Sequence, residues 1–301
     1  PRGVRRRVST VDQTIPDVGA LERALRGVGY LTDPGLATAL FCAARLPQPI
    51  LLEGEAGDGK TEAAKALAAA IDTPLIRLQC YEGIDAGEAL YEWNYTRQLL
   101  SIRLAEARGD HLADSDMFTD EFLVERPILA ALRHAGSRPA VLLVDEIDRA
   151  DDEFEAFLLE LLSDFQITIP EVGTIASSSR PIVVLTSNRT RELHDALKRR
   201  CLYHWIDYPT VAEEIDIVRV RAPEVAVTMA QKVVDAVHRL RDMDLAKPPG
   251  VAETLDWVQA LGAIDAHDLN GETAADTLGS VIKDRDDLDL VSSDIARVVD
   301  G

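Results

Sequence analysis

Short apolar runs alternate with helix-forming segments through the middle of the chain. Each run is bounded by turn residues, which predicts buried strands at 50–52, 75–78, 141–144, 182–185 and 202–206. The segment KTEAAKALAAA, which begins at Lys60, is one of the strongly helix-forming stretches between them. Strands that alternate with helices predict an α/β domain, in which helices flank a five-stranded parallel sheet.

Helical spacing of apolar residues dominates the two ends. Two short helices are expected within 21–44, broken near 27–29 and at Pro34. A further helix is expected over 151–165, followed by a small hairpin over 166–175. After Pro209 the strand pattern stops, and helices with a break at 247–250 are expected. The predicted domains are a flexible N-terminal arm over 1–18, the α/β domain over 19–208 and a smaller all-helical lid domain over 209–301.

Composition and charge narrow the classes of function. The 301 residues are 47% hydrophobic and 28% charged, as in an ordinary globular protein. A formal net charge of −20 disfavours binding to a phosphate backbone outside a local basic cleft. No apolar stretch is long enough to span a membrane, and the basic start is not followed by the apolar segment of a secretory signal. Cys42, Cys80 and Cys201 are too widely spaced for a metal knuckle, which favours a reducing, cytoplasmic location.

The strongest chemical signal is a glycine-rich loop between a predicted strand and a predicted helix. It consists of Gly54, Glu55, Ala56, Gly57, Asp58, Gly59, Lys60 and Thr61. The loop matches the phosphate-binding pattern G-x-x-x-x-G-K-[ST] at every fixed position. Glycines let backbone amides wrap phosphates, and the start of the following helix favours anions. Lys60 is expected to neutralise the β- and γ-phosphates, and Thr61 to bind Mg²⁺.

Polar residues follow two further predicted strands. Asp145 is expected to hold Mg²⁺, and Glu146 to polarise a water molecule for attack on the γ-phosphate. Asn188 is expected to orient that water or to contact the γ-phosphate, unless it only starts a turn. Arg199 and Arg200 precede the last strand. They are either surface cations at a helix end or an arginine finger offered to a neighbouring subunit.

The order of these four elements across 54–201 resembles that of the AAA+ ATPases. Three segments resemble the MoxR branch more closely, and within it the members associated with maturation of carbon monoxide dehydrogenase-type molybdenum enzymes. These segments are LQCYEGIDAGEALYEWNYTRQLL, FEAFLLELLSDFQITIPEVGTI and LTSNRTRELHDALKRRCLYHWIDYP. The resemblance implies the Walker A role for Lys60 and Thr61 and the Walker B role for Asp145 and Glu146. It further implies that Asn188 is the sensor-1 residue and that Arg200 is the arginine finger, with Arg199 as the neighbouring candidate.

The resemblance also implies a reaction and partners. The reaction is hydrolysis of ATP with Mg²⁺, used to remodel or activate a client protein, with a metalloenzyme as the expected client. The implied partners are identical subunits in a ring, expected to be a hexamer, and a von Willebrand A-type protein. Neither nucleic acid nor a membrane span is expected.

Two segments concern how the ring would work on a client. The branch inserts a small hairpin where residues 91–98 fall, and the alternating Tyr91, Trp93 and Tyr95 either pack or contact a partner.

The family often has an arginine at the sensor-2 position, but none occurs in 247–253. Lys247 is the candidate substitute. No role is predicted for the basic arm or for residues 265–301.

Three rival functions stay open from the sequence. The first is a nucleic-acid motor or transcriptional activator of the same superfamily, against which the net charge and the absent GAFTGA loop argue. The second is a small-molecule P-loop kinase, which would need no arginine from a neighbour. The third is an ATP-gated module without hydrolysis, against which Glu146 and Arg200 argue. A GTPase is disfavoured because no N-K-x-D motif occurs.

Overall fold

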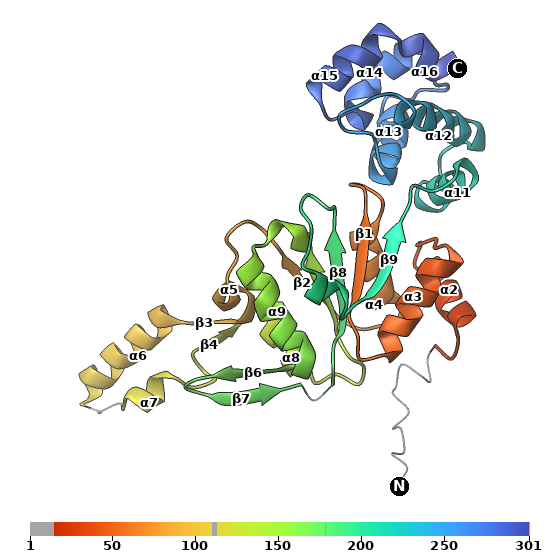
Figure 1. The fold of residues 1–301 in the computed structure, drawn as a ribbon. Coiled ribbons are helices and arrows are strands. Elements are labelled where there is room, and N and C mark those ends of the chain that lie inside the picture. Colours follow the sequence, from red (N-terminus) through yellow and green to blue (C-terminus); the bar gives the residue numbers. More distant parts are fainter. Residues whose placement is uncertain (1–14, 110–112, 178, 301) are drawn as a thin grey trace. The chain divides into compact units, whose positions relative to one another are not determined.

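The computed structural model describes residues 15–109, 113–177 and 179–300 (Figure 1). The chain divides into two compact units. The first contains the residues up to Ala24, Asp33–Glu53 and Ala64–His204, and the second contains Leu25–Thr32, Gly54–Ala63 and the residues from Trp205 onward. Most of the predicted arm at 1–18 lies outside the described residues. None of the described helices combines the length and apolar character that a bilayer span needs.

A five-stranded parallel sheet forms the framework, as predicted. Its strands lie in the order β2-β5-β8-β1-β9. They are β1 (Ile50–Gly54), β2 (Leu75–Gln79), β5 (Val141–Asp145), β8 (Ile182–Ser187) and β9 (Leu202–Ile206). Every residue of β1, β5 and β8 is buried. Strands covered on both faces need apolar residues at successive positions, which explains why these runs were recognisable in the sequence.

Helices around the sheet confirm the predicted pattern. They are α2 (Val18–Gly27), α3 (Pro34–Arg45), α4 (Lys60–Ala70), α8 (Pro127–Arg133), the 3₁₀ turn η1 (Ile147–Arg149), α9 (Asp152–Asp164) and α10 (Asp195–Lys198). Asp33 caps α3 by accepting from the Gly35 and Leu36 amides, and Asp151 caps α9. The predicted hairpin is β6 (Gln166–Ile169) paired antiparallel with β7 (Gly173–Ala176).

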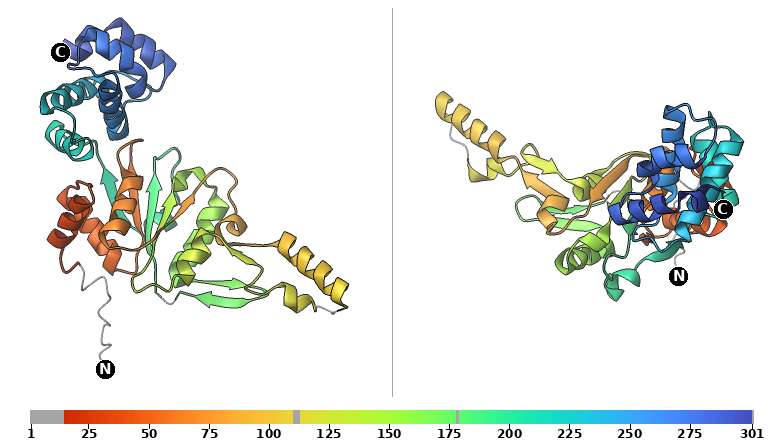
Figure 2. Two further views of the ribbon diagram at one scale, coloured as in Figure 1. Left: turned by 180° about the vertical axis from the view of Figure 1, so that it is seen from behind. Right: turned by 90° about the horizontal axis from the view of Figure 1, so that it is seen from above.

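The segment around Trp93 differs from the predicted hairpin over 91–98. Strand β3 (Tyr91–Trp93) follows α5 (Ala86–Leu90) and pairs antiparallel with the distant β4 (Leu123–Glu125). Between them lie α6 (Tyr95–Arg108) and α7 (Asp114–Met117). The Asn94 side chain accepts from the Arg97 amide at 2.9 Å and so starts α6 immediately after the strand. Figures 1 and 2 show α6 extending away from the sheet.

This arrangement separates the three aromatic residues. The Trp93 side chain is only 7% exposed and packs edge-on against Tyr91 and Phe118, at centroid distances of 6.0 and 5.2 Å. Tyr95, by contrast, is 66% exposed. Of the two alternatives for these aromatics, packing is therefore confirmed for Trp93, which belongs to the core, whereas Tyr95 is left exposed.

The residues after Pro209 are helical, with the predicted break at 247–250. The helices are α11 (Val211–Arg221), α12 (Val227–Arg241), α13 (Val251–Ala263), α14 (Gly271–Val281), α15 (Arg285–Ser293) and α16 (Ile295–Asp300). They share a hydrophobic core of their own, in which Trp257 is fully buried. The indole Nε1 of Trp257 donates to Thr277 Oγ1 at 2.8 Å, so its one polar group is satisfied.

Replacing Trp93 should test its place in the core. Trp93→Ala is expected to lower the free energy of unfolding by about 3–5 kcal/mol, because it removes a buried aromatic side chain. Tyr95→Ala is the matched control and should change it by less than about 0.5 kcal/mol. Urea unfolding followed by circular dichroism measures both. Similar small effects in the two variants would contradict the burial of Trp93.

Candidate functional site

The glycine-rich loop runs from the end of β1 to the start of α4. Gly57 and Gly59 have φ values of +80° and +97°, in the left-handed region that favours glycine. A Cβ atom at Gly54 would lie 2.5 Å from the Ile206 carbonyl oxygen, so no side chain fits there. The three glycines of the motif are thus required by backbone geometry in this chain.

Lys60 folds back over the loop that precedes it. Its side chain is 6% exposed. The Nζ atom donates to the Gly54 carbonyl at 3.0 Å, the Glu55 carbonyl at 2.6 Å and Asp58 Oδ1 at 3.0 Å. Burial raises the pKa of Asp58, although the Lys60 ammonium opposes this. The loop therefore presents a buried cation at the N-terminus of α4, where an anionic ligand is favoured.

Asp145 ends β5 and is buried. Its Oδ2 accepts from Arg77 Nε at 2.9 Å and Nη2 at 2.6 Å, and its Oδ1 accepts from Thr186 Oγ1 at 2.6 Å. Arg77 reaches it from the neighbouring strand β2, where Gln79 is the residue paired with Asp145. Across the described residues, no group of three His, Cys, Asp or Glu side chains could cage a metal. Mg²⁺ binds one or two carboxylates together with substrate phosphates, so the chemistry of Asp145 suits this ion, although Arg77 and Thr186 contact both of its oxygens here.

Glu146 has an unusual backbone. Its φ of +55° lies in the left-handed region, which is rare for a residue with a side chain and is common at functional sites. Its amide donates to Thr186 Oγ1 at 2.9 Å, and its Oε2 lies 2.8 Å from Arg149 Nε. Thr186 thus links Asp145 and Glu146. Thr186 was not predicted, and its signal in the sequence is a hydroxyl near the end of an otherwise apolar strand.

Asn188 directly follows β8, the strand between β5 and β1. Strands β5 and β8 are parallel, so the chain leaves both at the same edge of the sheet. Ser187 Oγ accepts from the Arg189 amide at 3.0 Å, and Arg189 has a φ of +57°. The structure therefore brings Asn188 to the edge that carries Asp145 and Glu146.

The two candidate finger residues differ in their surroundings. Both arginines are exposed after α10. The Arg200 guanidinium donates to the Leu159 carbonyl and to Ser163 Oγ, both on α9 of the same chain. The Arg199 guanidinium makes no ion pair or hydrogen bond with the rest of the described chain. Of the two side chains, that of Arg200 is thus held on α9, whereas that of Arg199 is not.

Two other residues near the loop were not predicted. Tyr30 places its Cε2 atom 4.0 Å from the Cβ position of Gly59. Gly250 packs directly against Gly57. Both are far from the loop in sequence, so neither carried a local signal. The Nζ atom of Lys247, the candidate sensor-2 substitute, pairs with Asp284 Oδ2 at 3.1 Å.

Comparison with known proteins decides the family. Residues 49–201 match the AAA domain of the dynein-related subfamily. The chain belongs to this family. The matched region begins just before β1 and ends just after Arg200, so it includes the glycine-rich loop, Asp145, Glu146 and Asn188. This AAA protein therefore carries an ATPase-type, nucleotide-binding domain.

Several relatives and structures are similar to this AAA protein. An uncharacterized protein of Staphylococcus haemolyticus is 26% identical over 240 residues, which cover 77% of this chain and 81% of the relative. An uncharacterized protein of Staphylococcus aureus is 27% identical over 179 residues. That alignment covers 57% of this chain and 59% of the relative. The Thermotoga maritima RuvB Holliday junction branch migration motor has a TM-score of 0.45 at 19% identity, over 81% of this chain and 66% of that one.

Lys60 should serve both the fold and nucleotide binding of this AAA protein, and two variants separate these effects. Lys60→Ala is expected to weaken ADP binding by about tenfold to a hundredfold, because a charge-assisted contact is lost. It should also destabilise the protein, because buried Asp58 loses its cation. Asp58→Asn combined with Lys60→Ala should recover stability but not affinity. Titration with a fluorescent ADP analogue measures the affinity, and thermal unfolding measures the stability. Wild-type affinity in Lys60→Ala would remove Lys60 from the nucleotide site.

Proposed function

We propose that this AAA protein is a MoxR-type ATPase that hydrolyses ATP in order to remodel or activate a client protein. The observation that carries the ATPase assignment is the pair Asp145 and Glu146, fixed together by Thr186 at the end of β5. A buried carboxylate and a partly exposed one, adjacent in the chain, suit two different tasks. Asp145 would hold a cation, and Glu146 would stay accessible to water.

The proposed roles follow from the chemistry of each group. The loop amides and Lys60 bind the phosphates of ATP. Thr61 and Asp145 would hold Mg²⁺, which when bound neutralises charge on the β- and γ-phosphates. Glu146 accepts a proton as a water oxygen bonds to the γ-phosphorus and the bond to the ADP oxygen breaks. Asn188 orients that water.

The active form is proposed to be a ring, with six subunits as the expected number. Arg199, with Arg200 as the alternative, would stabilise charge on the γ-phosphate of the neighbouring subunit. The hydrogen bonds that hold Arg200 on α9, and the lack of such side-chain partners for Arg199 among the described residues, support this choice. The proposed partners are a metalloenzyme client, expected to be a molybdenum enzyme, and a von Willebrand A-type protein.

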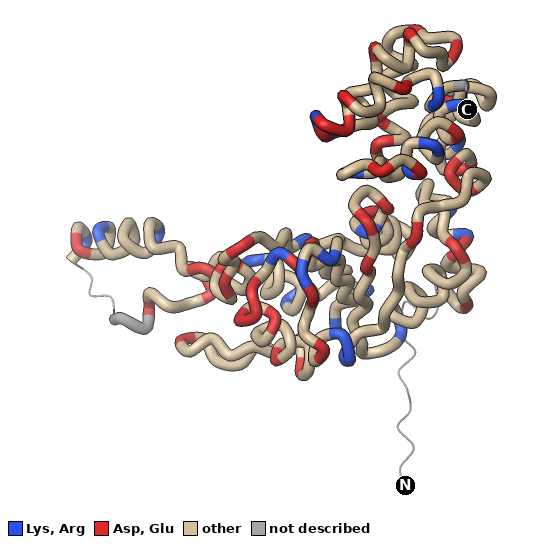
Figure 3. Tube along the Cα trace, turned by 45° about the horizontal axis from the view of Figure 1, so that its top comes forward, with Lys and Arg blue, Asp and Glu red and all other residues tan. Residues whose placement is uncertain are grey.

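The client contact is proposed to lie on α6 rather than on Trp93. This helix exposes four large apolar side chains, Tyr95, Leu99, Leu100 and Leu104. It also carries three arginines and one glutamate in a chain whose net charge is −20. Figure 3 shows acidic residues spread over both units. A basic, apolar helix on an acidic protein suits a client surface that presents carboxylates around an apolar patch.

A nucleic-acid motor is the alternative function, and the basic residues of α6 are what favour it. However, two of these arginines already have acidic partners. Arg97 pairs with Glu121 at 2.8 Å, and Arg103 pairs with Glu106 at 3.1 Å. The exposed leucines between them would face phosphates unfavourably. A protein client therefore explains both the exposed leucines and the arginines of α6, whereas nucleic acid would explain only the arginines.

Subunit mixing tests the proposed division of labour between neighbours. Glu146→Gln alone should bind ATP but not turn it over, because the water loses its proton acceptor while the side chain keeps its shape. Arg199→Ala alone should lose turnover by about a thousandfold or more, as for other arginine fingers. Rings that contain both variants should regain part of the ATP turnover. At some of their interfaces, the intact Glu146 of one subunit meets the intact Arg199 of its neighbour. Phosphate release measures turnover, and the same mixing with Arg200→Ala identifies the finger. Wild-type turnover in Glu146→Gln would overturn its assignment.

Deletion and complementation in the host test the client. A strain without this protein is expected to make the client metalloenzyme in normal amount but with an immature metal centre. Wild-type protein should restore molybdenum-enzyme activity, whereas Glu146→Gln and a Leu100→Ser/Leu104→Ser variant should not. Leu290→Ser, which changes an exposed leucine on α15, is the matched control and should restore it. Fully active molybdenum enzymes in the deletion strain would exclude the maturation role. ATP turnover stimulated by DNA would favour the motor instead.

A further inference from the structure

The start of α13 lies directly on the phosphate loop. The Val251 and Ala252 amides donate to the Gly57 carbonyl at 3.0 and 3.4 Å. A Cβ atom on Gly250 would lie 2.7 Å from Gly57 Cα and 2.8 Å from the Ala56 carbonyl oxygen. The contact is therefore backbone against backbone, and no side chain fits at position 250.

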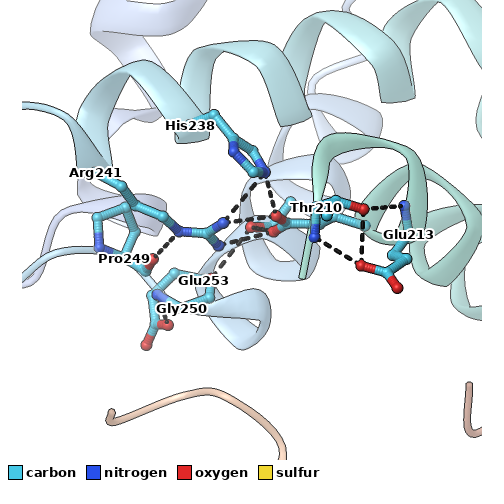
Figure 4. A network of polar contacts seen from close by, with 9 residues as sticks. Thr210, Glu213, His238, Arg241, Pro249, Gly250 and Glu253 are labelled. Carbon is cyan, nitrogen blue, oxygen red and sulfur yellow. Dashed lines mark hydrogen bonds and ion pairs between the residues drawn. The ribbon is translucent and has the colours of Figure 1, made fainter. Parts of the chain in front are cut away.

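The turn that makes this contact is held from both sides. Glu253 Oε2 accepts from the Gly250 amide at 2.9 Å and so caps α13. Arg241 Nε donates to the Pro249 carbonyl at 2.8 Å, and Thr254 Oγ1 lies 3.1 Å from the Gly250 carbonyl oxygen. Figure 4 shows Arg241, Pro249, Gly250 and Glu253 gathered at this turn. The position of Gly250 is thus fixed by its neighbours.

Behind the turn, a buried carboxylate joins three helices. Glu214 of α11 is fully buried. It accepts from Arg241 Nη1 and Nη2 of α12 at 2.6 and 2.9 Å, and from Thr254 Oγ1 of α13 at 2.6 Å. His238 Nε2, also on α12, lies 2.9 Å from Glu214 Oε2. Bidentate pairs of this kind hold a precise geometry, so the turn and the three helices are connected through satisfied polar contacts.

The geometry at Gly57 has a consequence for the next amide. In a planar trans peptide, the carbonyl of one residue and the N–H of the next point in opposite directions. The contact with α13 fixes the direction of the Gly57 carbonyl. It therefore also fixes the direction of the Asp58 N–H, which points away from α13. Backbone N–H groups of this loop are the donors that bind phosphate in the proposed function.

We propose that Gly250 is a positioning residue for nucleotide binding. Its turn holds the phosphate loop in the binding conformation and transmits the shape of the loop to α11, α12 and α13. This inference rests on the proposed nucleotide site and goes beyond it, because it names how the helical segment responds to the nucleotide.

A pair of glycine variants in α13 and its cap tests the inference. Gly250→Ala is expected to weaken binding of a fluorescent ADP analogue by about tenfold, because the new Cβ must displace the loop. The KM for ATP should rise in parallel, whereas kcat at saturating ATP should be retained. Gly262→Ala is the matched control, since nothing lies within 4 Å of its added Cβ. It should bind ADP like the wild type. Wild-type ADP affinity in a folded Gly250→Ala variant would overturn the positioning role.

Hydrogen exchange on the wild-type protein keeps the test decisive if Gly250→Ala does not fold. Addition of ADP should slow exchange at the Val251 and Ala252 amides, while residues 258–263 of α13 should be unchanged. Unchanged exchange at both amides in the presence of bound ADP would overturn the inference alone. Failure of the wild-type protein to bind ADP at all would overturn the proposed function as well.

Discussion

The left-handed backbone of the phosphate loop is the constraint on which the site depends. Gly57 and Gly59 reverse the chain sharply enough for Lys60 to point back at the Gly54 and Glu55 carbonyls. A side chain at either glycine would strain that reversal. The same reversal exposes the Gly57 carbonyl to α13. One local feature of the backbone therefore determines both where the cation lies and what the helical segment contacts.

Buried carboxylates recur at the candidate site and behind the turn at Gly250, and three of them are paired within their own units. Asp58 has Lys60, Asp145 has Arg77 and Glu214 has Arg241. Such pairs add little net stability, because desolvation opposes the attraction, but loss of one partner is costly. Their main effect here is to hold groups in defined places. This explains why charged residues lie in a region where apolar ones would pack more easily.

Most of the fold could be predicted because its signals are local. Apolar runs marked all five strands of the parallel sheet, and the glycine-rich loop and the Asp145–Glu146 pair appeared in consecutive residues. Arg77, Thr186 and Gly250 could not be predicted, since their roles depend on strand register and on contacts between distant segments. The hairpin over 91–98 was wrong for a related reason. The alternating aromatics indicated a strand, but the Asn94 cap begins a helix, and the pairing strand lies far along the sequence. Hydrogen bonds to α9 distinguish Arg200 from Arg199, and adjacent positions in a sequence do not reveal such a difference.

The short ribbon of β3 and β4 has an evolutionary consequence. The Asn94 amide donates to the Phe122 carbonyl at 2.8 Å, so the chain leaves and re-enters the domain at nearly the same point. Helix α6 lies between these two residues. Insertions, deletions or exchange of this segment would leave the register of the central sheet untouched. A lineage could therefore acquire a different helix at this position by replacing one segment, while the central sheet was inherited unchanged.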